Sequence, residues 1–444
     1  MAGEPWVQLK LSEIMDVKHG FAFPGENIRD EPPGDVLLTP GNFAIGGGFK
    51  GDKFKYFDGD IPDDYILNEN DLIVTMTDLS KQSDTLGYPA LVPKPQHCRY
   101  LHNQRIGKVV IRDPKKTDRR FVSYVLRTPE YRHEVLASST GTTVKHTSPS
   151  RILGFKALIP PFAEQRAIGH ILGTLDDKIE LKRRTSETLE AMAQALFKSW
   201  FVDFDPVRAK AEGCDPGLPQ SIANLFPDRL VDSELGEIPE GWQVGSILEH
   251  ARLMSGGTPK TGRPEFWDGT IPWASAKDVS QSHGSILIET ERTITQQGLD
   301  ESATQMIPAF CSVVVARGAT TGRMVLFGRD MAMNQTCYAL ATTTETPFAL
   351  YCQLRVEIDA LVHAAHGSVF DTITTSTFAS SQVVLPARPA LAAFEDRVVP
   401  IFQCIRQSIY ESRTLAALRD TLLPKLMSGE IRVQDADKFI GVAR

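Results

Sequence analysis

The tripeptide Pro160-Pro161-Phe162 resembles the active-site motif of enzymes that methylate adenine in DNA. That chemistry needs Asn, Asp or Ser just before the first proline, because this side chain accepts a hydrogen bond from the amino group of the flipped base. Ile159 occupies the position and cannot accept one. We therefore interpret the prolines as the end of a strand and the start of a helix.

No other catalytic or metal-binding motif has the required spacing. Gly46-Gly47-Gly48 is not followed by a convincing helix, and Gly107-Lys108 continues into an apolar strand, so neither predicts a phosphate-binding loop. The 6 cysteines form no Cys-x-x-Cys pair, and the 10 histidines show no zinc spacing. No apolar run approaches the length of a membrane span. We expect a cytosolic chain with reduced thiols that binds no cofactor or metal.

Polar loops at matching positions in the two halves of the chain are candidates for binding nucleic acid. Their Arg, Lys, Gln, Asn, Ser and Thr side chains can reach base edges and phosphates, although Asn-Gln pairs equally well cap turns. The candidate DNA-contacting residues are Lys81, Gln82, Ser83, Asn103, Gln104, Arg105, Thr142, Thr143, Lys145 and His146 in the first half, and Lys277, Arg317, Thr320, Thr321, Arg323, Asn334, Gln335, His366 and Ser368 in the second.

The charge distribution gives this interpretation mixed support. The net charge of −7 argues weakly against nucleic acid. However, the stretch from Arg99 to Lys156 holds thirteen Lys or Arg against four Asp or Glu, so it carries +9 and the remainder −16. Phosphate contact requires a local basic face rather than a basic protein. The alternative is an ordinary solvated basic surface.

The chain contains an internal repeat. The sequence ALIPPF, from Ala157, recurs loosely as VVLPAR, from Val383, an offset of 226 that needs no gap between Gly141 and Phe204. Upstream the offset drifts, so that HNQRIGKVVI lies opposite MNQTCYALA and PWVQLKLSEI opposite GWQVGSILEH. Each half is therefore a variable region of about 150 residues followed by a more regular one. The variable regions show short β-like segments broken by Gly and Pro, which predict an α+β globule.

The regular regions read as long helices with apolar residues at coiled-coil spacing. Polar residues interrupt both stripes at matching positions, Lys182 and Ser186 in one and Ser408 and Ser412 in the other, which favours a mutual pair over two separate amphipathic core helices. The expected seam residues are Ile168, Leu172, Leu175, Ile179, Leu189, Leu196 and Trp200 in the first helix, and Phe394, Val398, Ile401, Ile405, Leu415, Leu422 and Leu426 in the second.

The chain path favours an antiparallel pair. The first helix could run from about Ala163 to Asp203, roughly 60 Å at 1.5 Å per residue. Pro, Gly and acidic residues from Asp205 to Trp242 predict a linker after it. An antiparallel second helix places the second variable region where this linker emerges. We expect an α+β fold of two globular domains joined by two long antiparallel helices, with pseudo-two-fold symmetry.

The whole pattern resembles the specificity subunit of type I restriction-modification systems. The sequence from IPPFAEQRAIGHIL to LKRRTSETLEAMAQALFKSWF looks like the central conserved region of that family, LPKLMSGEI like its distal end and GEIPEGW like the entry to its second recognition domain. VTMTDLS and HNQRIGK look like segments of the recognition domains. The second helix lacks the Glu164-Gln165 pair of the first, so no role of this pair is carried over to it.

This resemblance implies a domain order and a set of partners. It implies target-recognition domains at residues 1–157 and 241–386, spacer helices at 158–204 and 387–430, a linker at 205–240 and a tail at 431–444. It also implies a non-catalytic, cytoplasmic prokaryotic protein that reads one bipartite, asymmetric site in double-stranded DNA and binds no membrane. Two methyltransferase subunits holding S-adenosylmethionine would dock on the helices, and restriction subunits using ATP and Mg would join them. The rivals are an enzyme that methylates or cuts DNA unaided and a helical scaffold without a DNA role.

Overall fold

The structure is a computed structural model and describes residues 5–51, 53–78, 80, 83–95, 98–141, 144–365 and 372–433. The chain folds as two units. The first unit comprises Met1–Lys178 and Thr414–Arg444, and the second comprises Ile179–Arg413. Each unit therefore takes part of both conserved regions as well as one variable region, rather than leaving the helices as separate spacer domains.

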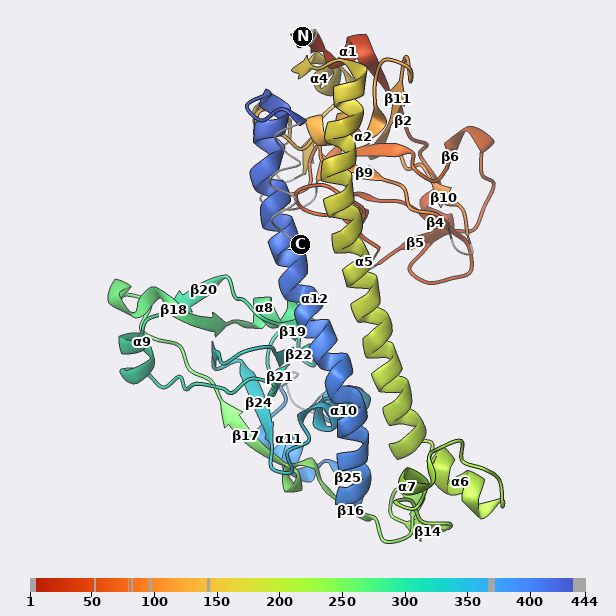
Figure 1. The fold of residues 1–444 in the computed structure, drawn as a ribbon, viewed down its shortest axis with the longest axis vertical. Helices are drawn as coiled ribbons and strands as arrows, with labels where there is room; N and C mark the ends of the chain where they lie inside the picture. Colours follow the sequence, from red (N-terminus) through yellow and green to blue (C-terminus); the bar gives the residue numbers. More distant parts are fainter. Residues whose placement is uncertain are drawn as a thin grey trace. The chain divides into compact units, whose positions relative to one another are not determined.

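Two long helices, α5 (Phe162–Phe201) and α12 (Arg388–Ser428), contribute to both units (Figure 1). In the first unit, the Glu164 carboxylate near the start of α5 accepts a hydrogen bond of 2.8 Å from Arg432, just beyond the end of α12. Further along α5, Asp176 accepts one of 2.6 Å from Arg419. Residue numbers rise along one helix as they fall along the other, so the helices are antiparallel here.

The same direction holds in the second unit. Lys182 of α5 forms an ion pair with Glu411 of α12. Near the end of α5, the Phe197 ring lies 5.5 Å from the Phe394 ring near the start of α12. The expected antiparallel pairing is thus confirmed within each unit, and Lys182 is compensated by a carboxylate.

The first unit places two main sheets beside short helices. Their strand orders are β2-β11-β7-β9 and β3-β5-β4-β10-β6. Its elements before α5 are β1 (Val7–Lys10), α1 (Leu11–Ile14), β2 (Met15–His19), η1 (Gly25–Asn27), β3 (Ile28–Arg29), β4 (Asp35–Leu37), η2 (Pro40–Asn42), β5 (Lys55–Phe57), η3 (Asp63–Tyr65), β6 (Ile66–Leu67), β7 (Leu72–Thr75), β8 (Thr77–Asp78), β9 (Pro89–Leu91), β10 (Tyr100–Leu101), β11 (Ile106–Ile111), α2 (Arg119–Val125), α3 (Pro129–Ala137), β12 (Lys145–His146), α4 (Pro149–Gly154) and β13 (Lys156–Ile159).

The second unit repeats this plan with sheets β17-β24-β21-β22-β19 and β20-β18-β23. Its elements between α5 and α12 are α6 (Asp205–Ala211), α7 (Gln220–Ala223), β14 (Leu230–Ser233), β15 (Gly236–Pro239), β16 (Gln243–Ser246), η4 (Ile247–Glu249), β17 (Ala251–Ser255), η5 (Pro264–Phe266), β18 (Trp267–Ala274), α8 (Ala276–Gln281), β19 (Ile286–Leu287), β20 (Arg292–Ile294), α9 (Gln296–Asp300), β21 (Ser312–Val315), β22 (Met324–Phe327), β23 (Ala332–Met333), β24 (Cys337–Thr342), α10 (Pro347–Ala365), α11 (Thr375–Ser380) and β25 (Gln382–Leu385).

A two-stranded ladder closes each unit next to the start of its long helix. Val7 pairs with Ile159 in β1 and β13, and Gln243 pairs with Leu385 in β16 and β25. Ile159 and Leu385 are 226 residues apart, so the repeat offset found in the sequence is confirmed at this ladder. Ile159 is a buried strand residue, which agrees with the proline pair ending a strand rather than forming an active site.

The Glu164-Gln165 pair is structural. The buried Gln165 side chain accepts a hydrogen bond of 2.9 Å from the Asp118 backbone N–H and donates bonds of 3.0 and 2.9 Å to the carbonyls of Lys116 and Pro160. It thereby fixes the start of α5 to the loop before α2. In the repeat, the corresponding position is Leu391, which is buried among apolar side chains.

The predicted linker is folded onto the second unit. It forms α6, α7 and the β14–β15 hairpin, and its Phe226 ring lies 5.2 Å from the ring of Trp200 on α5. Phe204 and Val207 are also buried in this cluster. These apolar side chains explain why the segment packs against the end of α5 although its Pro and Gly content predicted an open connection.

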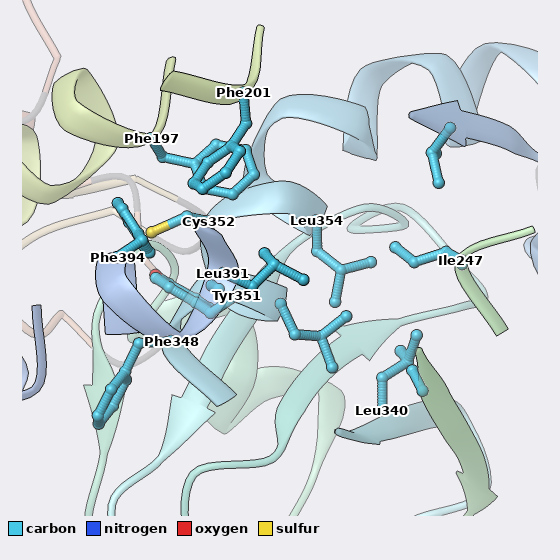
Figure 2. Close-up of a cluster of buried hydrophobic side chains, with 14 of the residues drawn as sticks. Phe197, Phe201, Ile247, Leu340, Phe348, Tyr351, Cys352, Leu354, Leu391 and Phe394 are labelled. Carbon is cyan, nitrogen blue, oxygen red and sulfur yellow. The ribbon is translucent and has the colours of Figure 1, made fainter. Parts of the chain in front are cut away.

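All the expected seam residues are buried or half-buried. The buried face is wider than the seam, however, because each helix packs against a variable region as well as against the other helix. Figure 2 shows this in the second unit, where Phe197 and Phe201 of α5 and Leu391 and Phe394 of α12 lie with residues of α10 such as Tyr351. A strict coiled-coil pattern misses such additional core positions.

Candidate nucleic-acid interface

The three polar loops predicted in the first half meet at Met76. The Met76 N–H donates to the Arg105 carbonyl at 2.9 Å, and the Met76 carbonyl accepts from the Thr147 N–H at 3.0 Å. Strand β8, which follows Met76, pairs with β12, and the Thr77 hydroxyl lies 3.1 Å from Nδ1 of His146. Loops that are distant in sequence are therefore held side by side by backbone hydrogen bonds.

The second half builds the same junction at Ala316. The Ala316 N–H donates to the Thr336 carbonyl at 2.8 Å, and the Ala316 carbonyl accepts from the Ile373 N–H at 2.9 Å. Arg317 forms a β-bridge with Thr372. Met76 and Ala316 thus occupy equivalent positions, and the bonds of the described residues agree with the alignment of the loop pairs made from sequence.

The candidate residues differ in how far they are free to bind a ligand. Gln104, Arg105 and His146 are exposed in the first unit, and Arg317, Arg323 and Gln335 are exposed in the second. Lys145, Thr320 and Thr321 are half-buried, and the Thr321 hydroxyl donates 2.7 Å to the carbonyl of Gly318, which closes a turn. The candidates Lys81, Gln82, Thr142, Thr143, His366 and Ser368 lie outside the described residues.

Four candidates have structural roles in these positions. Oδ1 of Asn103 accepts a hydrogen bond of 2.9 Å from the Arg105 N–H, and Oδ1 of Asn334 accepts one of 3.2 Å from the Thr336 N–H. These side chains cap their own turns. Two further candidates are less free than the sequence indicates: Ser83 is buried, at 5% exposure, and Lys277 forms an ion pair of 2.6 Å with Glu291.

Two residues that the sequence analysis did not single out shape the loop after Met76. The buried Asp78 carboxylate accepts bonds of 2.6 and 2.5 Å from the N–H groups of Ser80 and Thr85. Burial raises the pKa of Asp78, but these hydrogen bonds outweigh it and hold the pKa below its ordinary value. From helix α3, Arg132 donates to the Ser83 carbonyl and lies 4.3 Å from the Tyr88 ring.

The basic stretch from Arg99 to Lys156 is partly neutralised in the fold. At least six of its basic side chains form ion pairs, mostly with acids outside the stretch: Arg99 with Asp35, Lys108 with Asp71, Arg112 with Asp16, Lys116 with Asp113, Arg120 with Asp177 and Arg127 with Asp176. The local excess of positive charge read from the sequence is therefore smaller in the fold, because acids from outside the stretch pair with five of its basic side chains. Arg105 is exposed beside the junction at Met76 and has no ion pair among the described residues.

The arrangement supplies hydrogen-bond donors and acceptors rather than reactive groups. In the described part of the chain, no cluster of three or more His, Cys, Asp or Glu could hold a metal ion. Burial raises the pKa of Cys311 to about 11 and that of Cys337 to about 12, which disfavours a nucleophilic thiolate. The described helices include none long and apolar enough for a membrane span. The exposed Gln and Arg side chains suit the recognition of base edges and phosphates.

Comparison with known proteins gives consistent matches. The model of the type I restriction modification DNA specificity domain matches residues 3–191 and 239–390. The HindI specificity subunit of Haemophilus influenzae is 29% identical over 348 residues, covering 68% of this chain and 75% of that protein. The MjaIX specificity subunit of Methanocaldococcus jannaschii is 24% identical over 354 residues, covering 79% and 76%.

A solved structure shares the fold. The S subunit of a type I restriction-modification system from M. genitalium superimposes with a TM-score of 0.56 at 16% identity, covering 95% of this chain and 96% of that one. The two matched segments of this chain each contain one of the loop junctions described above, at Met76 and at Ala316.

Proposed function

The chain belongs to the type I restriction modification DNA specificity family, with two matched regions, and from this premise we propose that it reads one bipartite, asymmetric target in double-stranded DNA. Each unit would read one half of the target through its loop junction. The single observation that carries the proposal is the repeated hydrogen-bond pattern at Met76 and Ala316. A repeated backbone frame with different side chains is what two different half-sites require.

The side chains on the two frames differ in ways that predict different half-sites. At corresponding positions the first unit presents Arg105 where the second presents Thr336, and the exposed Arg317 after Ala316 corresponds to the buried Thr77 after Met76. Guanidinium groups favour guanine edges and phosphates, whereas hydroxyls discriminate less. The two halves of the target should therefore not be inverted copies of each other.

We propose further that the chain acts without catalysing a reaction and directs partner subunits. Two methyltransferase subunits would supply S-adenosylmethionine, and restriction subunits would supply ATP- and Mg-dependent chemistry. This proposal rests on the family and on the nature of the described loops, which offer amides and guanidiniums rather than an acid–base pair. We place the complex in the prokaryotic cytoplasm, where its DNA is found.

The test combines binding and methylation. The full chain, together with the methyltransferase subunit of its own system, should methylate DNA at one bipartite sequence found by methylation-sensitive sequencing. The chain alone should bind DNA with an affinity that falls as salt rises, and should transfer no methyl group. Methyl transfer by the pure chain would support an unaided enzyme instead. Failure to bind DNA with or without the partner would favour a scaffold without a DNA role.

A further inference from the structure

A loop that follows β17 lies beside the second junction and was not singled out from sequence. Two tryptophan side chains hold its backbone, one at its first residue and one at its middle. Nε1 of Trp273 donates to the Gly257 carbonyl at 3.0 Å, and Nε1 of Trp267 donates to the Lys260 carbonyl at 3.3 Å. The two indole rings pack edge to face at 5.2 Å. We call residues 257–263 the pinned loop.

The pinned loop belongs to the same surface as the candidate residue Gln335. The Gly257 N–H donates to the Met333 carbonyl at 2.9 Å, just before Asn334 and Gln335. A Cβ atom on Gly256 would lie 2.2 Å from the Asn334 carbonyl oxygen, so only glycine allows this approach. The closeness of these backbones places the loop next to the junction at Ala316, because Thr336 bonds to Ala316.

A side-chain contact joins the loop to Gln335. The Thr258 hydroxyl donates a hydrogen bond to Oε1 of Gln335, while the Gln335 side chain is exposed. The Thr258 hydroxyl holds the end of the Gln335 side chain at one place on the surface, and in the observed arrangement it bonds to the amide oxygen. Oε1 keeps a second lone pair, and Nε2 keeps its two donors. A glutamine in this state presents one acceptor and one donor side by side, which matches N6 and N7 of adenine in the major groove.

The first unit lacks this contact. The Phe21 N–H donates to the His102 carbonyl at 2.8 Å, as Gly257 does to Met333, so Ala22 stands where Thr258 stands in the repeat. Alanine has no hydroxyl to orient Gln104. The fixed amide is therefore a property of the second half and not a general requirement of the fold.

The pinned loop also offers a cation. Lys260 is exposed and forms no ion pair with the residues that the structure describes. By contrast, Arg263 pairs with Glu265 at 2.7 Å and with Glu301 at 3.1 Å, and Lys277 pairs with Glu291. A lysine on a rigid loop, next to a group oriented for a base edge, is suited to contact a DNA phosphate.

We propose that the pinned loop is a DNA-contact segment in which Lys260 binds a phosphate and Thr258 orients Gln335 to read an adenine of the second half-site. This inference rests on the proposed DNA-binding function. The two indole hydrogen bonds reduce the conformational entropy that the loop loses on binding. Lys260 should contribute affinity without sequence preference, whereas Thr258 acts through Gln335 and should contribute sequence preference.

The experiment uses the full chain and a pool of duplexes with randomised sequence, from which bound molecules are sequenced. The wild type should enrich one bipartite sequence. Thr258→Val should lose the preference for adenine at one position in one half of it and retain all other preferences, and Thr258→Ser should restore it. Binding of the enriched duplex should then be measured against salt. Lys260→Gln should lower the slope of log affinity against log salt by about 1, the value for one phosphate contact.

Lys198→Gln is the matched control, because Lys198 is an exposed lysine of the same unit that is paired with Asp203 and is not a candidate DNA contact. Its salt slope should equal that of the wild type. If Lys260→Gln keeps the wild-type slope, or Thr258→Val enriches the wild-type sequence, the inference is overturned while the proposed function stands. If the wild type enriches no sequence, the proposed function fails and the inference fails with it.

Discussion

Asp176 on α5 accepts a hydrogen bond of 2.6 Å from Arg419 on α12, and the same carboxylate accepts bonds of 2.7 Å from Arg127 and from the Tyr124 hydroxyl. One acidic side chain therefore links both long helices to the variable region of the first unit. Burial raises the pKa of Asp176, but the two guanidiniums and the hydroxyl outweigh it and hold the pKa below its ordinary value.

In the second unit, apolar side chains link the long helix α12 to the variable region. The position 226 residues after Asp176 is Phe402, whose ring stacks on Phe348 at 4.5 Å and lies 5.7 Å from the Tyr351 ring. Phe402 is buried at 1% exposure. The repeat thus preserves the place of the contact between helix and variable region but not its chemistry. The first unit should consequently depend more on pH and salt than the second.

Replacing Asp176 by Asn should destabilise the first unit by about 2–3 kcal/mol, because it leaves Arg127 and Arg419 partly buried without a counter-charge. Urea unfolding followed by circular dichroism measures the change. Glu187→Gln is the control, since Glu187 pairs with Arg183 at the surface of α5 and should cost less than about 0.5 kcal/mol. Equal effects of the two substitutions would contradict the assigned role of Asp176.

The contribution of Asp176 should depend on pH in a defined direction. Its pKa is lower in the folded chain than its ordinary value of 3.8, so the unfolded state binds the proton first as pH falls. The stabilisation is complete above about pH 5 and is lost as pH falls through the folded pKa. The difference in unfolding free energy between the wild type and Asp176→Asn should therefore shrink below pH 4. A difference that grows in acid would refute this sign.

Arg132 should act on specificity for the first half-site. It supports the Ser83 carbonyl and the Tyr88 ring beneath the loop after Met76, so Arg132→Met should leave that loop less ordered. Ordering two side chains on binding costs about 1–3 kcal/mol, which predicts target binding about 5-fold to 150-fold weaker. Binding to duplexes altered in one half-site at a time measures this loss.

We expect Arg132→Met to discriminate less between correct and altered sequences in the first half-site, and to discriminate as the wild type does in the second. His133→Ala is the control, because His133 is exposed on the same helix next to Arg132. A uniform loss of preference in both half-sites would instead indicate general unfolding.

The sequence predicted the elements that depend on periodicity and repetition. The two long helices follow from apolar spacing, and the fixed offset of 226 predicted the match of Ile159 with Leu385. The sequence could not predict contacts between residues that are far apart along the chain. Lys108 looks like part of a basic stretch until β11 places it 2.6 Å from Asp71.

In the candidate site, too, the sequence predicted the features that repeat and missed those that depend on contacts in the fold. Three loop pairs were found because polar residues recur in them, but the pinned loop was missed because its first-half counterpart, with Ala22, shares little of its polar character. The available signal was Gly20 and Gly256. At each of these positions an added Cβ atom would lie within 2.2 Å of a backbone carbonyl oxygen. Only the sheet shows that these glycines bring another loop to the junction.

The first half alone, Met1 to about Ser233, should form a dimer. Its half of the helix pair would otherwise expose Phe197, Trp200 and Phe201, which are buried in the intact chain, and an apolar surface of this kind rarely stays exposed in a soluble monomer. The offset of 226 places these three residues of one copy where Leu423, Leu426 and Met427 pack in the first unit of the intact chain. Two copies can therefore pair antiparallel through identical surfaces.

The pairing has two weak points. Lys182 would lie opposite Thr185 of the second copy, because Thr185 corresponds to Glu411, so an ion pair is lost and the two copies of Lys182 come within about one helical turn of each other. Larger rings in place of Leu and Met side chains would cost about 1–3 kcal/mol through overpacking. Light scattering after size-exclusion chromatography should give the mass of a dimer at micromolar concentration. Phe197→Asp should give a monomer, because it puts a charge into the apolar interface. A monomeric first half without any substitution would show that the helix surface does not pair with its own copy.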